Sequence, residues 1–399
     1  MKVSRSSPPA RGAGSNPPNR FEHLTLERDA DWDPEQDPLP RTQFIRDRSS
    51  SILSSNDSPD IGYEASLNPY RGCEHGCIYC YARPTHEYLG FSSGLDFETK
   101  IMVKEDAPRL LRQELSSPGW VPKVIALSGV TDPYQPVERR LKLTRACLEV
   151  LAEFRNPVTV VTKNSLVTRD LDLLAELASC QAAAVYISLT TLDTQLRKIL
   201  EPRTSPPAAR LATITALAKA GIPTGVLVAP VIPGLTDHEI PAVLAAAASA
   251  GASFSAHTVL RLPYAVAPLF EEWLTRHAPE KKEKVLHRIR ALRRGKLSNS
   301  EFGLRMRGEG IFADQIARLF EVACRKAGWS GREPELSTAS FRRPGGAQLE
   351  LSLPQPAGGA VASRECGGSL IQTHKPQHAP SEARPVREEP GTNRGIPAE

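Results

Sequence analysis

Three cysteines of this chain are spaced closely enough to bind one metal centre. Cys73, Cys77 and Cys80 fall within eight positions, although the 399-residue sequence has only 7 cysteines. Thiolates are the usual protein ligands of iron–sulfur clusters and of zinc. Gly72 and Gly76 supply the backbone freedom that a loop needs to fold tightly around such a centre. The spacing predicts a metal site in which all three thiols come from one loop.

The number of thiols favours an iron–sulfur cluster over zinc. Structural zinc usually takes four ligands, often from two separated cysteine pairs, and this chain has no second Cys-x-x-Cys pair. His75 or His86 would have to complete a zinc site. A four-iron cluster held by three cysteines instead leaves one iron free to bind a substrate or cofactor. Zinc, and a buried group of free thiols, remain as alternatives.

The segment from about residue 120 to 277 alternates short β-branched runs with helical patterns, in units of ~30 residues. It predicts strands over 124–127, 158–161, 184–188, 224–229 and 254–260. Helices are predicted over 139–154, 170–179, 194–200, 208–220 and 238–250, with Gly221 and Gly251 just past two of them. This alternation favours a parallel sheet with helices outside it, curled into a full or partial barrel. An open doubly wound sheet is the alternative.

Proline is concentrated at the two ends of the chain. Residues 1–44 and 331–399 hold 16 of the 35 prolines, a composition typical of disordered segments. We therefore expect disordered N- and C-terminal tails. Between them we expect a barrel domain over 45–264 and a helical C-terminal extension over 265–330.

The composition excludes several classes of protein. No run of about 18 apolar residues is present to span a membrane, and the N-terminus lacks the apolar region of a secretory signal. Seven scattered cysteines in a chain this long do not form a disulfide framework. We expect a cytoplasmic protein in a reducing compartment, with no membrane partner.

A basic stripe within the helical extension accounts for the excess positive charge. Residues 280–307 carry 10 basic and 3 acidic side chains, a local charge of +7 against +5 for the whole chain. Lys281, Lys284 and Arg288 share one side at helical spacing. The 281–307 stripe is a possible contact for nucleic-acid phosphates. More often such a stripe is the solvated side of an amphipathic helix, and no aromatic residues are interleaved for base stacking.

The cysteine loop resembles the motif of the radical S-adenosylmethionine (radical SAM) enzymes. The similar residues are Cys73-x-x-x-Cys77-x-x-Cys80, with the aromatic Tyr79 before the last cysteine. The resemblance implies a 4Fe-4S cluster whose free iron binds S-adenosyl-L-methionine. It implies reductive cleavage of this cofactor to a 5′-deoxyadenosyl radical, which abstracts hydrogen from an unidentified substrate. An electron donor such as a flavodoxin or ferredoxin is the implied partner.

The resemblance also implies a fold and a branch of the superfamily. The fold is α/β, a partial (β/α)6-type TIM barrel with the cluster loop after its first strand and the active site at the C-terminal strand ends. The branch is the one related to spore photoproduct lyase, and the similarity runs from about residue 41 to 329. It is carried by the blocks Asn68–Cys73, Thr131–Pro136, Thr162-Lys163 and Leu200–Arg203.

Individual roles follow from the same resemblance. Tyr79 and Tyr81 flank Cys80 and are implied to act in catalysis, as a contact for the cofactor and a hydrogen-atom relay. Lys163 is implied to lie near the cofactor carboxylate and Ser188 near its ribose. The other implied cofactor-binding residues are Ser128, Gly129, Thr131, Asp132, Glu201 and Arg203. From the residues alone, Asp132 equally suits a turn cap, Lys163 a surface site, and Glu201 and Arg203 a surface ion pair.

One position departs from the pattern of the lyase. The lyase has a cysteine shortly before the position of Thr131, where it returns a hydrogen atom to the repaired thymine. Gly129 stands at the equivalent position here and has no thiol to donate. We therefore expect a radical SAM enzyme whose lyase or transferase type is open, and not photoproduct lyase activity. The alternative is a non-catalytic nucleic-acid-binding protein whose cysteines hold zinc.

Overall fold

Six parallel strands, in the order in which the chain visits them, form most of the central sheet of this α/β protein. The computed structural model describes residues 11–21, 41–329 and 333–344. In that part of the chain the sheet has the order β10-β9-β8-β7-β6-β3-β2 and is not closed into a full barrel. The strands are β2 (Leu53–Ser55), β3 (Ala65–Leu67), β6 (Ile125–Leu127), β7 (Val158–Thr162), β8 (Ala183–Ser188), β9 (Thr224–Val231) and β10 (Phe254–Val259). Only β2 runs antiparallel to its neighbour.

Strand β8 illustrates why the sequence forms a sheet covered on both faces. All six of its residues are buried, as expected of a strand inside a parallel sheet. Val185 and Ile187 belong to the main hydrophobic core. Ala184 and Tyr186 point to the opposite face, where they pack with Phe254 of β10. The five predicted strands correspond to β6–β10, with ends that agree to within two residues.

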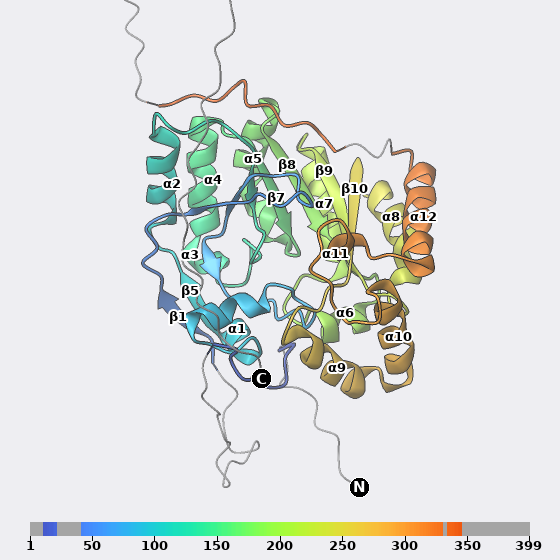
Figure 1. The fold of residues 1–399 in the computed structure, drawn as a ribbon. Coiled ribbons are helices and arrows are strands. Elements are labelled where there is room, and N and C mark those ends of the chain that lie inside the picture. The colour runs from blue at the N-terminus through green and yellow to red at the C-terminus, as the bar shows by residue number, and fades with distance from the viewer. Residues whose placement is uncertain (1–10, 22–40, 330–332, 345–399) are drawn as a thin grey trace, which may run out of the picture. The chain divides into compact units, whose positions relative to one another are not determined.

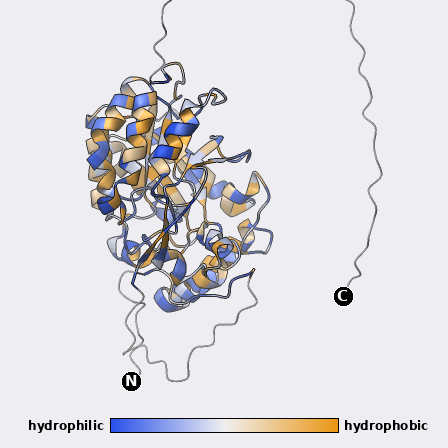
Figure 2. Cartoon of the chain, turned by 90° about the vertical axis from the view of Figure 1, so that its left-hand side faces the viewer, coloured by the Kyte–Doolittle hydropathy of each residue, from blue (hydrophilic) through white to orange (hydrophobic). Residues whose placement is uncertain are grey.

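Helices follow the strands and pack their apolar sides on the main core (Figure 1). They are α2 (Ala107–Ser116), α4 (Leu143–Phe154), α5 (Leu171–Ser179), α7 (Pro207–Lys219) and α8 (Ile240–Ser249). Helix α6 (Thr194–Leu200) packs instead in a second hydrophobic core. Figure 2 shows hydrophobic and hydrophilic residues alternating along the helices, as expected when one side of each is buried. None of the helices in the described residues has the length and apolar character needed to cross a bilayer.

The helix predicted over 139–154 is broken, which corrects the prediction. Helix α3 (Glu138–Leu141) ends at Lys142, whose φ of 55° is left-handed, and α4 begins immediately afterwards. The buried Glu138 carboxylate stabilises the break, because it accepts a hydrogen bond from Thr144 N at 3.0 Å and pairs with Arg169 at 2.7 Å. No local sequence pattern predicts the contact between Glu138 and Arg169, because Arg169 belongs to another element.

A smaller sheet and the helical extension flank the central sheet. The small sheet has the order β1 (Gln43–Arg46), β5 (Lys100–Val103) and β4 (Tyr70–Arg71). The extension consists of α9 (Val266–His277), α10 (Lys282–Leu292), α11 (Leu304–Arg307) and α12 (Ile311–Lys326). Trp273 of α9 donates from Nε1 to Ile199 O at 3.0 Å, which anchors the extension beside α6.

The described parts of both expected tails make specific contacts, which the expectation of disorder there did not include. Residues 11–21 pack beside the cysteine loop, where the backbone N–H groups of Gly12 and Ala13 donate to Glu98 at 3.0 and 2.8 Å. At the other end, Arg342 N donates to Phe154 O at 2.9 Å, at the end of α4. The rest of the two predicted tails lies outside the described residues.

Candidate metal and cofactor site

The cysteine loop begins directly after β4 and requires its two glycines. Gly72 and Gly76 have φ values of 79° and 67°, which favour glycine. A Cβ on Gly72 would lie 2.9 Å from His86 Cε1, and one on Gly76 would lie 2.8 Å from Glu98 Oε2. Both positions therefore exclude a side chain by conformation and by space. The prediction that these glycines permit a tight loop is confirmed.

The three thiols are free and shielded from solvent. Cys73 and Cys77 are buried and Cys80 is half-buried. Burial raises the pKa of Cys77 well above its ordinary value, and burial with the neighbouring Cys73 raises the pKa of Cys80 to about 11. Each of these two thiols therefore keeps its proton until a metal displaces it.

The donor set fits a cluster better than a single ion. Among the described residues, no three His, Cys, Asp or Glu side chains come together closely enough to hold one metal ion. A four-iron cluster does not require the three thiols to meet at one ion, because each thiolate binds a separate iron. His86, one candidate for a fourth zinc ligand, instead shares a hydrogen bond between its Nε2 and Lys100 O at 2.9 Å. Cys73, Cys77 and Cys80 thus fit a cluster that takes three protein ligands.

A buried ion pair holds one half of the loop in place. Arg83 is fully buried, donates from Nη2 to Cys77 O at 2.9 Å, and pairs with Glu98 at 2.6 Å. Sequence analysis did not identify this pair. The two residues are far enough apart in the chain that only the fold joins them, so no spacing pattern could have found them.

Gln135 holds the other half of the loop. It accepts a hydrogen bond from Glu74 N at 2.9 Å and donates to Gly72 O at 3.1 Å. Gln135 lies within Thr131–Pro136, one of the sequence blocks that carry the resemblance. That block is the feature of the sequence that could have identified Gln135, although sequence analysis did not name it as a site residue. Its amide uses both a donor and an acceptor on the same loop, so the block after β6 fixes the conformation of the cysteine loop.

Asp132 joins the ends of two strands to the loop. Its Oδ1 accepts from Thr162 Oγ1 at 2.7 Å, and its Oδ2 accepts from Lys163 N at 2.7 Å and lies 3.3 Å from His75 Nδ1. Burial opposes ionisation of Asp132, but the charge of His75 and these hydrogen bonds lower its pKa overall. The side chain is thus fully occupied by protein groups, and Asp132 acts here as a positioning residue.

Lys163 lies at the centre of a polar network at the carboxyl edge of the sheet. Its Nζ donates to Ser188 Oγ at 2.7 Å and to Ala229 O at 2.9 Å, and lies 3.2 Å from Glu201 Oε1. The same Nζ is 5.7 Å from the ring centroid of Tyr79, next to the loop. The structure therefore brings Lys163, Ser188, Glu201 and Tyr79 together, and a surface position for Lys163 is wrong.

Glu201 and Arg203 do not pair with each other. Glu201 is fully buried and pairs with Arg210 as well as with Lys163. Burial raises its pKa, but the charges of Arg210 and Lys163 outweigh that effect and hold the pKa well below its usual range. Arg203 instead binds Glu74 of the cysteine loop at 3.0 Å. Arg210, which sequence analysis missed, is the second cation of the network.

The turn after β6 has a conformation that few side chains tolerate. Ser128 and Gly129 have φ values of 152° and 109°, in the region that favours glycine. Thr131 is buried beside them, where its Oγ1 donates to Tyr70 O and its N donates to Asn68 Oδ1, both at 3.2 Å. The turn presents backbone groups at Ser128 and Gly129, while Thr131 fixes it to the segment before the loop.

The two tyrosines beside Cys80 have different environments. Tyr79 is buried and hydrogen-bonds Glu201 and Thr190, the latter at 3.2 Å. Tyr81 is 48% exposed and donates its hydroxyl proton to Gly129 O at 2.5 Å. Tyr79 is therefore fixed within the polar network, whereas Tyr81 lies at the solvent side of the site.

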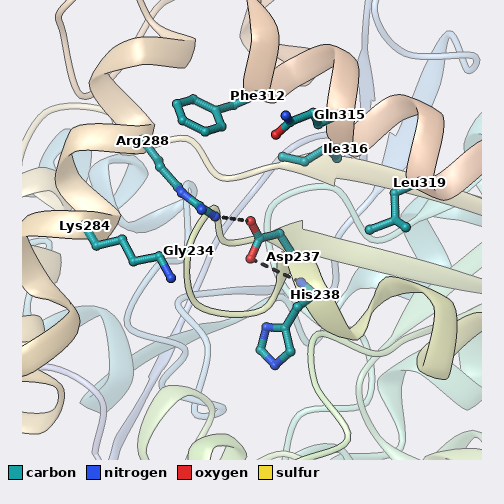
Figure 3. A pocket seen from close by; sticks show the side chains of 9 residues that line it. All are labelled: Gly234, Asp237, His238, Lys284, Arg288, Phe312, Gln315, Ile316 and Leu319. Carbon is teal, nitrogen blue, oxygen red and sulfur yellow. Dashed lines mark hydrogen bonds and ion pairs between the residues drawn. The ribbon is translucent and has the colours of Figure 1, made fainter.

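The basic stripe is divided between exposed and internally bound cations. Lys281 and Lys284 are exposed, but Arg288 pairs with Asp237 at 2.8 Å and lies 5.1 Å from the ring centroid of Phe312. Figure 3 shows Arg288 and Lys284 beside Asp237 in a pocket between α10 and α12. Three other arginines of the stripe also bind groups of this chain: Arg293, Arg294 and Arg305.

The sequence of this chain is similar to those of known proteins. The Radical SAM superfamily matches residues 67–247. An uncharacterized protein of Mycobacterium tuberculosis strain H37Rv is 42% identical over 222 residues, which are 55% of this chain and 65% of that protein. An uncharacterized protein of Methanocaldococcus jannaschii is 30% identical over 199 residues, covering 50% of this chain and 71% of that one. The match thus spans just under two thirds of the mycobacterial relative.

Among solved structures, spore photoproduct lyase with a dinucleoside spore photoproduct has a TM-score of 0.48 at 17% identity, covering 71% of this chain and 78% of that one. The matched region of the superfamily contains the three-cysteine loop and the strand ends β3 to β9 that surround it. This chain belongs to the radical SAM superfamily, whose enzymes use a 4Fe-4S cluster and S-adenosyl-L-methionine.

Proposed function

We propose that this protein is a radical SAM enzyme that abstracts a hydrogen atom from its substrate. The observation that carries the proposal is that the free thiols of one buried loop lie beside the network of Lys163 and Ser188 at the carboxyl ends of parallel strands. Cys73, Cys77 and Cys80 would hold a 4Fe-4S cluster there, which would supply the electron for reductive cleavage of S-adenosyl-L-methionine to methionine and a 5′-deoxyadenosyl radical.

The residues around the loop divide into cofactor contacts and positioning groups. Lys163 has more acceptors around its ammonium than its three protons can serve at once. It can therefore turn from a protein oxygen to the cofactor carboxylate while it stays paired with Glu201. Ser188 offers a hydroxyl to the ribose, and the turn at Ser128 and Gly129 offers backbone groups to the cofactor amino group.

The remaining site residues support these contacts. Asp132 and Thr131 fix the ends of β6 and β7, and Arg203 fixes the loop through Glu74. Tyr79 holds Glu201, and Tyr81, on the solvent side, is the better placed of the two tyrosines for a hydrogen-atom relay. Gly129 has no thiol, so a cysteine donor at this position is not part of the proposal.

Finer points of the proposal rest on the sequence. The strand order is compatible with a partial (β/α)6-type barrel, and the blocks around Asn68–Cys73 and Thr131–Pro136 support the branch related to spore photoproduct lyase. A cytoplasmic location and a flavodoxin or ferredoxin as electron donor belong to the same proposal.

Anaerobic reconstitution with iron and sulfide tests the proposal. The full chain is expected to take up about four irons and to convert S-adenosyl-L-methionine to 5′-deoxyadenosine when reduced. Cys73→Ala, Cys77→Ala and Cys80→Ala are each expected to abolish this conversion. Cys180→Ala is the matched control, because Cys180 is a half-buried free thiol at the end of α5.

Two outcomes would contradict the proposal. One is formation of 5′-deoxyadenosine at the wild-type rate by a variant lacking one of the three loop cysteines. The other is one zinc and no sulfide per chain, which would favour the alternative of a zinc-binding, non-catalytic nucleic-acid-binding protein. The internal ion pairs of the basic stripe give that alternative less support, because they leave fewer cations for phosphates.

A further inference from the structure

Arg261 is a partly buried cation without an anionic partner in the described part of the chain. It follows β10 directly and is half-buried. Within the described residues, the side-chain hydrogen bond of its guanidinium is the one from Nη1 to Met306 Sδ at 3.7 Å, and the ion pairs do not include it. A thioether is a weak acceptor, whereas a guanidinium has five N–H donors in a planar fork. Most of that fork is therefore unused.

The position of Arg261 is next to the proposed radical site. Its Cζ lies 4.6 Å from the ring centroid of Tyr81, and the Tyr81 hydroxyl donates to Gly129 O. Tyr81 follows Cys80 directly in the chain. A group bound by Arg261 would thus lie beside Tyr81, on the solvent side of the cysteine loop.

The surroundings fix Arg261 and compensate its charge only in part. Arg293 donates from Nη2 to Leu260 O at 2.8 Å, which holds the backbone immediately before Arg261. Asp60 is the nearby carboxylate, but Arg305 occupies it through a hydrogen-bonded ion pair. Burial and the charge of Arg305 lower the pKa of Arg261 overall, although Tyr81 and Asp60 act in the opposite direction, so the net effect of its surroundings is to disfavour the cation.

An anion bound to the free N–H groups of the Arg261 guanidinium would stabilise its positive charge. Guanidinium pairs with carboxylate and phosphate by two parallel hydrogen bonds. Phosphate suits this place better than carboxylate, because the nearby Arg293 donates to backbone carbonyl groups and its positive charge attracts a second negative charge. Tyr81 closes one side of the guanidinium plane, so the ligand approaches the N–H edge, as a bidentate oxyanion requires.

We propose that Arg261 binds a phosphate group of the substrate and thereby holds the substrate beside Tyr81. This assignment rests on the proposed function, because it treats the space next to the cysteine loop as the place of hydrogen abstraction. The phosphate can belong to a small phosphate ester or to the backbone of a nucleic acid, and the substrate class is a phosphate ester in both cases.

Calorimetric titration of the anaerobically reconstituted full chain, saturated with S-adenosyl-L-methionine, tests the assignment. The probes are inorganic phosphate, ribose 5-phosphate and a single-stranded DNA pentanucleotide, with ribose as the neutral control. We expect the wild type to bind at least one phosphate-bearing probe and not ribose. Arg261→Gln should weaken that binding at least about tenfold, the loss expected for a charge-assisted bidentate contact.

Two further variants make the result specific. Arg261→Lys keeps the charge and loses the fork, so its affinity should lie between those of the wild type and Arg261→Gln. If Arg261→Gln does not fold, Arg261→Lys replaces it in the test, because it too should bind the phosphate-bearing probe more weakly than the wild type. Arg109→Gln is the matched control, because Arg109 is exposed on α2, and its affinity should equal that of the wild type.

The outcomes separate this proposal from the proposed function. Tighter binding of ribose 5-phosphate identifies a small ester, and tighter binding of the pentanucleotide identifies a nucleic-acid backbone. Equal phosphate affinity in wild type and Arg261→Gln would overturn the assignment, as would loss of S-adenosyl-L-methionine affinity in the variant with phosphate binding intact. Failure of the wild type to cleave S-adenosyl-L-methionine would refute the proposed function instead, because the titration does not require turnover.

Discussion

Lys163 Nζ and Glu201 Oε1 lie 3.2 Å apart in a pair that is almost completely shielded from water. Glu201 also pairs with the buried Arg210, so one carboxylate lies between two cations. The local net charge is therefore +1. This excess is the charge that a cofactor carboxylate would neutralise, while Glu201 keeps Lys163 and Arg210 in place before the cofactor binds.

Removal of the Glu201 charge should destabilise the fold. Glu201→Gln leaves Lys163 and Arg210 as buried cations without a counter-charge, which typically costs about 3–5 kcal/mol. We expect a decrease of that size in the free energy of unfolding, measured by urea titration at neutral pH. Glu153→Gln is the control, because its pair with Arg112 is exposed and should contribute no more than about 1 kcal/mol. Equal losses in the two variants would show that the network is not electrostatically coupled.

The two tyrosines of the loop should differ in their contribution to stability. Tyr79→Phe removes a donor from the buried Glu201 carboxylate, a loss of about 1.5–3 kcal/mol for a hydrogen bond to a charged group. Tyr81→Phe removes a hydroxyl from a half-exposed ring whose acceptor, Gly129 O, can bind water instead. We expect its cost to be below about 1 kcal/mol. Thermal unfolding of both variants measures the difference, and a larger loss in Tyr81→Phe would contradict it.

Local sequence patterns were sufficient to predict those elements that depend on residues close together in the chain. The alternation of β-branched and helical segments predicted strands β6–β10, because each strand is followed by its own helix. Gly221 and Gly251 were expected just past two helices, and both have left-handed φ values, 74° and 103°. In α10, Val285 and Ile289 are buried, as their helical spacing predicted.

Contacts between distant segments account for what sequence analysis missed. Arg83 and Glu98 form a buried pair that clamps the loop, and Arg210 completes the network of Glu201. Charged residues at such positions look like surface residues in a single sequence, because only the fold buries them. The segment 11–21 is similar, since its proline-rich surroundings concealed two backbone hydrogen bonds to Glu98.

Acid should destabilise the protein partly through His257. This residue of β10 has its ring 4.1 Å from that of Phe320 in α12, and burial and the charge of Arg307 lower its pKa to about 4. The unfolded chain binds the proton near pH 6.5. Between about pH 6.5 and 4 the unfolded state therefore holds a proton that the folded state lacks, and stability falls as the pH falls. Above that window His257 makes no contribution to the pH dependence.

The same linkage sets the size of the stability loss that His257 causes. The loss across the window is at most about 3 kcal/mol. His257→Gln should flatten the pH dependence of the urea unfolding free energy between pH 6.5 and 4. His287→Gln is the matched control, because His287 is exposed on α10, and its pH dependence should follow the wild type. An unchanged slope in His257→Gln would show that this histidine is not the source.

Gly12→Ala should detach the segment 11–21 from the cysteine loop. A Cβ at Gly12 would lie 1.7 Å from Gly76 O, a backbone atom that cannot move without distorting the loop. The substitution therefore breaks the hydrogen bonds from Gly12 and Ala13 to Glu98, with a cost of about 3 kcal/mol or more for two bonds to a charged group. Hydrogen exchange of peptides covering 11–21 should lose protection, while the strands of the sheet keep theirs.

Gly62→Ala is the matched control for this prediction, because a Cβ at Gly62 meets nothing within 4 Å. It should leave exchange at 11–21 unchanged. Since Glu98 also pairs with Arg83, which holds Cys77 O, loss of the segment should reach the cysteine loop. We expect Gly12→Ala to incorporate less iron than the wild type on anaerobic reconstitution. Full protection of 11–21 in Gly12→Ala would show that the segment does not pack against Gly76. Reduced protection of 11–21 together with a normal iron content would show that the segment packs there without supporting the cysteines.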